Sequence, residues 1–192
     1  ASSHLMELIN EVLDLSKIEA GRFDLLLESV LVGPLIAESL QLIVPQAQQR
    51  GIEINLNFDG VVITVDELND QQKVVKADRV RLKQVLLNFL SNAVKYNCEN
   101  GKIIVDCKLG EKHMTISVTD TGPGLSLEQQ YLLFNSFDRL GAEDSDVEGT
   151  GIGLVITKNI IELMGGSIGV SSRPGEGCTF WVELPNESAY VA

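Results

Sequence analysis

The fold is decided by residues 79–119, which read RVRLKQVLLNFLSNAVKYNCENGKIIVDCKLGEKHMTISVT. In the first part, apolar residues recur at spacings of three and four, which predicts an amphipathic helix over residues 79–96 with one side on a sheet. The second part alternates polar and apolar residues, which predicts strands over residues 102–109 and 113–119. Because the connection near Gly110 is short, these two strands must pair antiparallel. The segment therefore predicts a helix packed on a sheet that contains a hairpin.

Strands and helices are interleaved along the rest of the chain. Upstream, we expect strands over 23–27, 52–58, 61–65 and 73–77, and a helix over 34–49 whose last turn Pro45 disfavours. Downstream, an irregular glycine- and acid-rich stretch over 121–151 precedes a helix over 152–164 and strands over 167–171 and 178–184. The pattern predicts an α+β fold: a two-layer α/β sandwich whose mixed, mostly antiparallel sheet is covered on one face by helices, with an additional N-terminal helix.

The first 21 residues are expected to form a unit of their own. Apolar residues recur at helical spacing from Leu5 to Ile18, and Gly21 is a stop signal. Such a stripe suits either a helix docked on the domain or one helix of a bundle or coiled coil. Residues 1–4 resemble a cloning remnant. We therefore divide the chain into a helical segment, residues 1–21, and a main domain, residues 22–192, whose last residues from Asn186 are expected to fray.

The composition excludes several classes of function. The chain has 192 residues and a net charge of -12, which argues against a broad basic face for nucleic acid or anionic lipid. Its three cysteines show no C-x-x-C spacing, so they indicate neither a disulfide framework nor a zinc site, and they favour a reducing, cytoplasmic setting. No apolar run reaches the ~18–20 residues of a membrane span. A local anion site built from backbone amides and a metal ion stays compatible with this charge.

Polar residues interrupt the predicted helix over 79–96 on one side. The spacings of four and three place Asn88, Asn92 and Lys95 on the same face. An amide oxygen can ligate Mg²⁺, which prefers hard oxygen donors and keeps several waters and phosphate oxygens. A lysine one turn away can neutralise a phosphate. Taken alone, the same three residues also suit an ordinary solvated helix face.

Three glycine-containing turns lie at the ends of predicted elements. Residues 120–124, DTGPG, follow a strand, and a carboxylate there can accept a hydrogen bond from an exocyclic amine while glycines let a planar ring approach. Residues 149–154, GTGIGL, open a helix, whose free amides can bind an anion. Residues 175–180, GEGCTF, precede the last strand. Each of these motifs also suits a plain turn, and the second is neither a P-loop nor a Rossmann fingerprint.

The order of these motifs is more specific than any one of them. An asparagine-bearing helix, an Asp-x-Gly-x-Gly turn, an acidic loop with Phe134-x-x-Phe137, a glycine-rich helix start and a Gly-x-Gly turn before the last strand follow one another. In this order they resemble the histidine-kinase branch of the GHKL ATPase superfamily, over about residues 23–185. Residues 8–21 resemble the end of the second helix of the kinase dimerisation and phosphoacceptor hairpin. The first helix, which holds the phosphoacceptor histidine in that family, is not in this sequence.

The resemblance implies that the cofactors are ATP and Mg²⁺, and it assigns roles to the adenine site. Asp120 would read the adenine amino group, and Gly122 and Gly124 would admit the base. Tyr96 would line the pocket, and Thr179 would assist through water.

The resemblance also assigns the phosphate site. Asn92 would ligate Mg²⁺, Asn88 would support the metal and phosphates, and Lys95 and Arg139 would contact phosphate. The glycine-rich helix start would wrap the phosphates through Gly149, Thr150, Gly151, Ile152, Gly153 and Leu154. Residues 125–148 would form a mobile lid that Phe134 and Phe137 anchor.

One departure within the superfamily is chemically informative. Chaperone and topoisomerase relatives place a glutamate general base one helical turn before the metal-binding asparagine, and this chain has Asn88 there. An amide cannot take a proton from water at neutral pH, so we expect little intrinsic ATP hydrolysis and phosphoryl transfer to a histidine instead. The implied partners are the phosphoacceptor hairpin of the same kinase, in a homodimer, and a response-regulator receiver domain. The alternatives are a chaperone-like or mismatch-repair-like ATPase, or a nucleotide-binding pseudokinase.

Overall fold

The computed structural model of the chain describes residues 24–133 and 153–186, together with Leu13, Ser16, Lys17 and Ala20. The predicted N-terminal helix therefore lies almost entirely outside the described residues. The same holds for most of the predicted lid and for residues 187–192.

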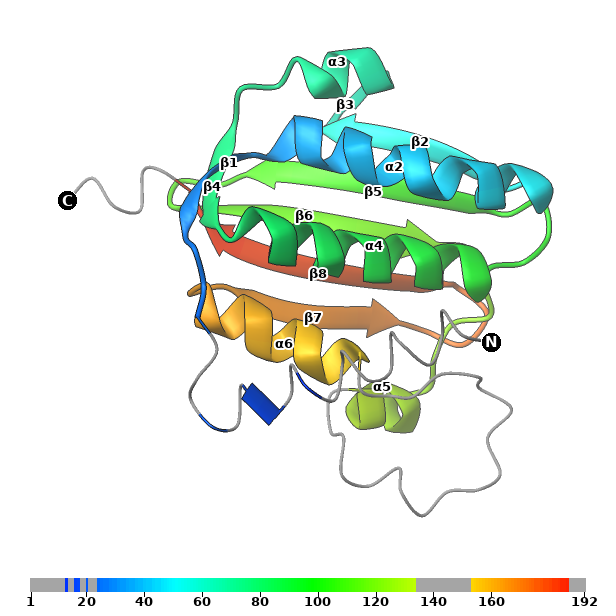
Figure 1. Cartoon of the computed structure of the whole chain (residues 1–192). Coiled ribbons are helices and arrows are strands. Elements are labelled where there is room, and N and C mark those ends of the chain that lie inside the picture. Colours follow the sequence, from blue (N-terminus) through cyan, green and yellow to red (C-terminus); the bar gives the residue numbers. More distant parts are fainter. Residues whose placement is uncertain (1–12, 14–15, 18–19, 21–23, 134–152, 187–192) are drawn as a thin grey trace.

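Six strands form one sheet in the order β3-β2-β5-β6-β8-β7 (Figure 1). Neighbouring strands are antiparallel except β2 and β5, which run parallel. Strands β1 and β4 pair separately as a two-stranded antiparallel sheet. The bounds are β1 Glu28–Leu31, β2 Glu53–Phe58, β3 Val61–Ile63, β4 Val74–Ala77, β5 Lys102–Leu109, β6 His113–Asp120, β7 Ser167–Ser172 and β8 Cys178–Pro185. The large sheet is thus mixed and mostly antiparallel, as predicted.

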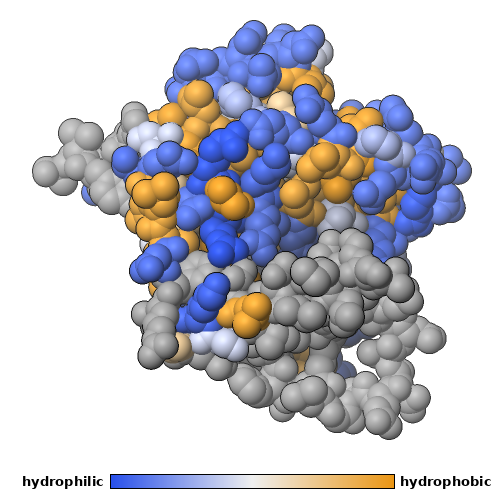
Figure 2. Space-filling view, in the orientation of Figure 1, coloured by the Kyte–Doolittle hydropathy of each residue, from blue (hydrophilic) through white to orange (hydrophobic). Residues whose placement is uncertain are grey.

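Three helices lie side by side on one face of this sheet: α2 (Val32–Gln49), α4 (Arg79–Lys95) and α6 (Gly153–Leu163) (Figure 1). Two short helices, α3 (Val65–Asn69) and α5 (Leu127–Leu133), lie at its periphery. The outer surface of the helical layer is largely hydrophilic, with separate hydrophobic patches (Figure 2). The arrangement confirms the predicted two-layer sandwich with helices on one face.

The core fills the space between the helices α2, α4 and α6 and the sheet. All the apolar residues of α4 that the spacing assigned to the sheet side are buried, namely Leu82, Val85, Leu86, Phe89, Leu90, Ala93 and Val94. The ring of Phe89 packs against that of Phe180 in β8, with 5.4 Å between the centroids. Burial alternates along β6, so that Met114, Ile116, Val118 and Asp120 all face the helices. The alternation therefore places one carboxyl group on the same face as the core.

The first predicted strand is wrong by several residues. Residues 24–27 belong to no strand, and β1 begins at Glu28, opposite Ala77 of β4. The backbone N–H of Leu26 donates to Asp78 Oδ2 at 3.1 Å instead of joining a ladder. The prediction relied on the apolar character of residues 23–27. That signal was misleading, because the Leu26 side chain is largely exposed and does not join the core.

The predicted strand over 61–65 ends at Ile63 because Thr64 caps a helix, α3, that was not predicted. Thr64 Oγ1 accepts from the backbone N–H of Glu67 at 3.2 Å, and the Glu67 carboxylate accepts from the N–H of Thr64 at 2.7 Å. Such a reciprocal capping box satisfies two backbone donors that a helix start leaves unpaired. The residues between the predicted strands over 61–65 and 73–77 therefore contain a short helix.

Helix α2 differs from the prediction in its first turn. It begins at Val32, two residues before Pro34, and it continues to Gln49 through Pro45. Pro45 is exposed, so the carbonyl that its missing N–H leaves unpaired can bond to water. Burial of Ile43 and Ala47 on the opposite side keeps the last turn helical.

Two further expectations needed correction. The irregular stretch that starts at residue 121 contains α5, whose start is fixed by a bond from Gln129 N to Ser126 Oγ at 3.2 Å. Asn186 is not frayed: it is buried, it bridges to Val75, and its Nδ2 donates to the carbonyl of Gly110 at 3.0 Å. Asn186 is therefore part of the packed domain.

Candidate functional site

The asparagines of α4 form a hydrogen-bonded row that ends on α6. Asn92 Nδ2 donates to Asn88 Oδ1 at 3.2 Å, and Asn88 Nδ2 donates to Thr157 Oγ1 at 3.1 Å. The hydroxyl of Thr157 in turn donates to the carbonyl of Gly153 at 2.8 Å. Both amides are half-buried, so they are neither core residues nor a freely solvated helix face. The row joins α4 to the first turn of α6.

Gly153 and Leu154 are the described part of the glycine-rich helix start. Gly153 opens α6, and Leu154 is half-buried and packs against the core. The fold therefore brings the start of α6 next to the asparagine row. The other predicted phosphate-site residues, namely Arg139, Gly149, Thr150, Gly151 and Ile152, lie outside the described residues. The same is true of Phe134 and Phe137 in the predicted lid.

Lys95 and Tyr96 lie at the C-terminal end of α4. Lys95 is the last residue of the helix and Tyr96 caps it, and both side chains are exposed. The Nζ of Lys95 lies 5.1 Å from the centre of the Tyr96 ring, within cation–π range. A cation and an aromatic face are thus held together one turn beyond Asn92.

Asp120 is a buried carboxyl group at the end of β6, with 6% of its surface exposed. Its Oδ1 accepts from the backbone N–H of Gly122 at 2.8 Å. Burial raises the pKa of Asp120, and hydrogen bonds from the N–H groups of Gly122 and Cys178 offset part of that rise. A desolvated acceptor of this kind favours a ligand that brings a donor to it.

Two glycines allow the turn after Asp120 to lie close to its neighbours. A Cβ on Gly122 would collide with the carbonyl oxygen of Tyr96, so only glycine lets the turn reach the end of α4. Gly124 has a φ of +70°, and a Cβ there would collide with the carbonyl of Arg173. The turn is therefore packed between α4 and the β7–β8 connection.

Thr179 lies away from Asp120, contrary to its predicted role. Burial alternates along β8, so Cys178 and Phe180 face the helices while Thr179 faces the other side of the sheet. There, Thr179 Oγ1 lies 2.9 Å from Thr119 Oγ1. Cys178, the register partner of Asp120, occupies the helix-facing position instead. The alternation of side chains along the predicted last strand could have indicated Cys178 from the sequence.

Cys178 is a neutral thiol in this environment. Burial, with the nearby charge of Asp120, raises the pKa of Cys178 to about 12. The three cysteines are all free. Among the described residues, no group of three or more His, Cys, Asp or Glu side chains is arranged to hold a metal ion. A cation at the asparagine row would therefore depend on amide oxygens and on the ligand.

Residues 77–188 match the family of histidine kinase-, DNA gyrase B- and HSP90-like ATPases, and the chain belongs to this family. The matched segment contains α4, the turn at 120–124 and the start of α6. It also spans residues 149–152.

Curated relatives confirm the predicted histidine-kinase branch. The sensor histidine kinase GacS of Pseudomonas protegens is 39% identical over 193 residues, which cover 96% of this chain and 20% of GacS. An uncharacterised sensor-like histidine kinase of Rhizobium meliloti is 33% identical over 193 residues, which cover 100% of this chain and 35% of that protein. The chain thus spans 20 to 35% of the length of the first curated relatives that it matches.

Solved structures agree. Full-length ShkA in complex with AMPPNP has a TM-score of 0.77 and 32% identity, over 95% of this chain and 36% of ShkA. The catalytic domain of the histidine kinase ThkA has a TM-score of 0.70 and 29% identity, over 84% of this chain and 96% of that domain. ThkA in complex with the response regulator TrrA has a TM-score of 0.70 and 26% identity, over 97% of this chain and 49% of ThkA.

Within the described part of the chain, no helix combines the length and apolar character needed to cross a bilayer.

Proposed function

We propose that residues 22–192 form the ATP-binding catalytic domain of a two-component sensor histidine kinase. Residues 1–21 would be the end of the second helix of its dimerisation and phosphoacceptor hairpin. The domain positions Mg-ATP so that the γ-phosphoryl group passes to a histidine of the hairpin and then to an aspartate of a response regulator. The family, the kinase relatives and the likeness to AMPPNP-bound ShkA support this proposal.

The observation that carries the nucleotide site is the buried Asp120 carboxyl group. It lies on the helix-covered face of the sheet, and Gly122 links its turn to the end of α4. The adenine amino group is a donor that would satisfy this acceptor, and the backbone of Tyr96 lies against the same turn. Thr179 is not part of this proposal, because its side chain faces the opposite side of the sheet. Cys178 replaces it as the neighbour of Asp120.

The asparagine row fits a magnesium ion that phosphate oxygens hold in large part. Asn92 uses its Nδ2 in the bond to Asn88, and its Oδ1 is the hard oxygen ligand that Mg²⁺ prefers. When bound, the ion would neutralise charge on the phosphates. Asn88 orients Asn92, and Lys95 supplies a positive charge at the end of the same helix. Residues 149–154 and Arg139 are expected to complete the phosphate site.

The site holds ATP without activating water. Asn88 occupies the position where a general base would lie, and its amide is engaged with Asn92 and Thr157 rather than poised to accept a proton. The γ-phosphoryl group therefore reacts with an imidazole nitrogen of the phosphoacceptor histidine. A phosphorus–nitrogen bond forms while the bond between the γ-phosphorus and the ADP oxygen breaks. The chain supplies position and charge neutralisation.

The proposed partners follow from the same function. ThkA was solved with a response regulator, which supports a receiver domain as the partner of this chain. We further propose that the parent protein is a homodimer through its hairpin and that this domain works in the cytoplasm.

Two measurements test the proposal. Titration with Mg-ATP should give saturable binding that Asp120→Asn weakens by at least about tenfold, because the acceptor for the adenine amino group is altered. Incubation with labelled ATP and a separate phosphoacceptor hairpin should produce phosphohistidine, with little phosphate release from the chain alone. Unchanged affinity in the variant would contradict the adenine role. Rapid stand-alone phosphate release would favour a chaperone-like ATPase, and binding without phosphohistidine would favour a pseudokinase.

A further inference from the structure

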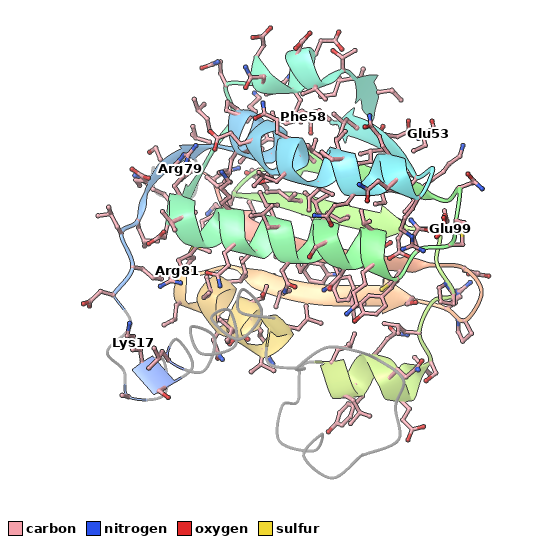
Figure 3. The ribbon with its side chains drawn as sticks, turned by 45° about the vertical axis from the view of Figure 1, so that its right-hand side comes forward. Lys17, Glu53, Phe58, Arg79, Arg81 and Glu99 are labelled. Atoms are coloured by element: carbon pink, nitrogen blue, oxygen red, sulfur yellow. The ribbon has the colours of Figure 1, made fainter. Side chains whose placement is uncertain are left out.

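The guanidinium of Arg50 lies at the C-terminal end of α4. Arg50 caps α2, and its Nη1 donates to the carbonyls of Val94 and Lys95, the second at 2.9 Å. Its Nη2 donates to the carbonyl of Asn97 at 2.9 Å, and its Nε to Glu99 Oε1 at 2.8 Å. One planar group thus contacts four acceptors along six consecutive residues. Figure 3 places Glu99 at this end of α4.

These contacts fix the backbone on both sides of Lys95 and Tyr96. The last carbonyls of a helix have no partner within it, and a cation there also suits the negative end of the helix dipole. Arg50 both donates to these carbonyls and places a positive charge at this end of α4. It lies at the end of α2, a helix that carries none of the predicted nucleotide contacts. Lysine could not replace it, because an ammonium group lacks the planar fork that spans several acceptors.

The same contacts extend to the Asp120 turn through Asn97. The side chain of Asn97 is buried, and its Oδ1 accepts from the hydroxyl of Thr121 at 3.1 Å. Its Nδ2 donates to the carbonyl of Lys102 at 3.0 Å, and the N–H of Lys102 donates to Thr121 Oγ1 at 2.8 Å. Thr121 directly follows Asp120. Arg50, Asn97 and Thr121 therefore form a continuous chain of hydrogen bonds, which we call the brace.

We propose that Arg50 is a positioning residue for nucleotide binding: through the brace it sets the end of α4, with Lys95 and Tyr96, relative to the Asp120 turn. This inference rests on the proposed function. The alternative is a purely structural role, in which Arg50 is one of several contacts that hold α2 against α4 and has no particular effect on nucleotide binding.

A matched tie exists at the other end of the same two helices. Arg79, labelled at the start of α4 in Figure 3, pairs with Glu38 of α2, and Lys83 joins the same carboxylate at 3.2 Å. Arg79→Lys therefore makes the same substitution at another guanidinium contact between α2 and α4, far along the helix from Lys95. It is the control for Arg50→Lys.

The test compares the two variants by Mg-ATP titration and by backbone hydrogen exchange. Arg50→Lys should weaken ATP binding about tenfold, since it loses charge-assisted bonds that order both contact elements. It should also speed exchange in peptides that cover residues 95–101 and 121–124. Arg79→Lys should leave the ATP affinity and the exchange rates within about twofold of those of the unaltered chain. A change this small is less than the loss of one hydrogen bond would cause.

Equal losses of affinity in the two variants, or unchanged affinity in Arg50→Lys, would overturn the positioning role. If Arg50→Lys proves unfolded by the fluorescence of Trp181, Thr121→Val tests the brace at its other end, and unchanged affinity there would overturn it too. If the unaltered chain binds no ATP, the proposed function fails and the positioning role with it. Faster exchange in Arg50→Lys would in that case identify Arg50 as a stabilising contact alone.

Discussion

Asn88 on α4 donates a hydrogen bond from Nδ2 to Thr157 Oγ1 on α6 at 3.1 Å. Thr157 is buried, and its hydroxyl also donates to the carbonyl of Gly153. One side chain thus connects the asparagine row to the helix start that is expected to meet the phosphates.

Thr157→Val should separate these two elements. The variant keeps the shape of the side chain but leaves the half-buried Asn88 amide without its acceptor, which costs about 1 kcal/mol. We expect a lower midpoint of denaturant unfolding and several-fold weaker ATP binding, measured by titration. Thr157→Ser restores the hydroxyl and is the control. Equal losses in both variants would mean that the methyl group, not the hydrogen bond, is what matters.

The pH dependence of stability should report the environment of Asp120. Its pKa is raised in the folded state, so between the unfolded-state and folded-state pKa values the folded chain holds a proton that the unfolded chain has released. The stability of the unaltered chain relative to Asp120→Asn should therefore rise as the pH falls from neutral through the folded-state pKa, and it should fall again as the pH is raised. Thermal unfolding of both proteins across this window measures the difference. A difference that shrinks with falling pH would contradict the raised pKa.

Asn88→Glu should convert the site towards hydrolysis. A carboxylate at this position can accept a proton from water, and general bases contribute roughly 10²–10⁴-fold to such steps. We expect at least a tenfold rise in phosphate release by the chain alone, measured under ATP saturation. Asn88→Gln has the same length without the base and should stay at the level of the unaltered chain. Release that is equally low in both variants would argue against the assignment of this position.

Gly60 and Gly124 both have a positive φ, but their surroundings differ. A Cβ on Gly60, φ +81°, would meet nothing within 4 Å, whereas one on Gly124 would collide with the Arg173 carbonyl. Gly60→Ala should therefore cost only the backbone term of about 1–2 kcal/mol. Gly124→Ala should cost clearly more and should also weaken ATP binding. Chemical denaturation of the two variants gives the comparison, and similar losses would show that the turn can move.

The three thiols should react at very different rates. Cys98 is exposed, whereas Cys107 and Cys178 are buried and burial raises the pKa of each to about 12. Thiol reagents at neutral pH should label Cys98 first and the other two only on unfolding. Peptide mass spectrometry identifies the labelled residue. Early labelling of Cys178 would indicate that the Asp120 region opens without global unfolding.

The parts of the fold that could be predicted are those in which a local pattern and its packing agree. Helix α4 has a regular apolar side, and the β5–β6 hairpin has clear alternation and a short turn. The exposed Leu26 shows the limit of hydrophobicity as a signal. At Thr64, the capping box was present in the sequence, but the preceding apolar run outweighed it.

The proximity of candidate residues on one helix was also accessible from the sequence, because the spacing of four predicts the neighbouring positions of Asn88 and Asn92, which a hydrogen bond joins. Thr179 was misplaced because a motif fixes position along the chain, while strand parity decides which face a side chain occupies. Arg50 could not be found, since it lies more than 40 residues before the carbonyls that it contacts. Every residue has a backbone carbonyl, so the sequence does not indicate which carbonyls a distant arginine will contact.

The parallel pairing of β2 with β5 has a consequence for dissecting this protein. The connection between these neighbouring strands includes β3, α3, β4 and α4, and the first strand of the pair, β2, precedes the segment matched to the family. Excising residues 77–188 would therefore strip β5 of a neighbour and leave a bare sheet edge, open to pairing with other chains. The shortest folding unit must reach back at least to β2, about 25 residues before the family match begins.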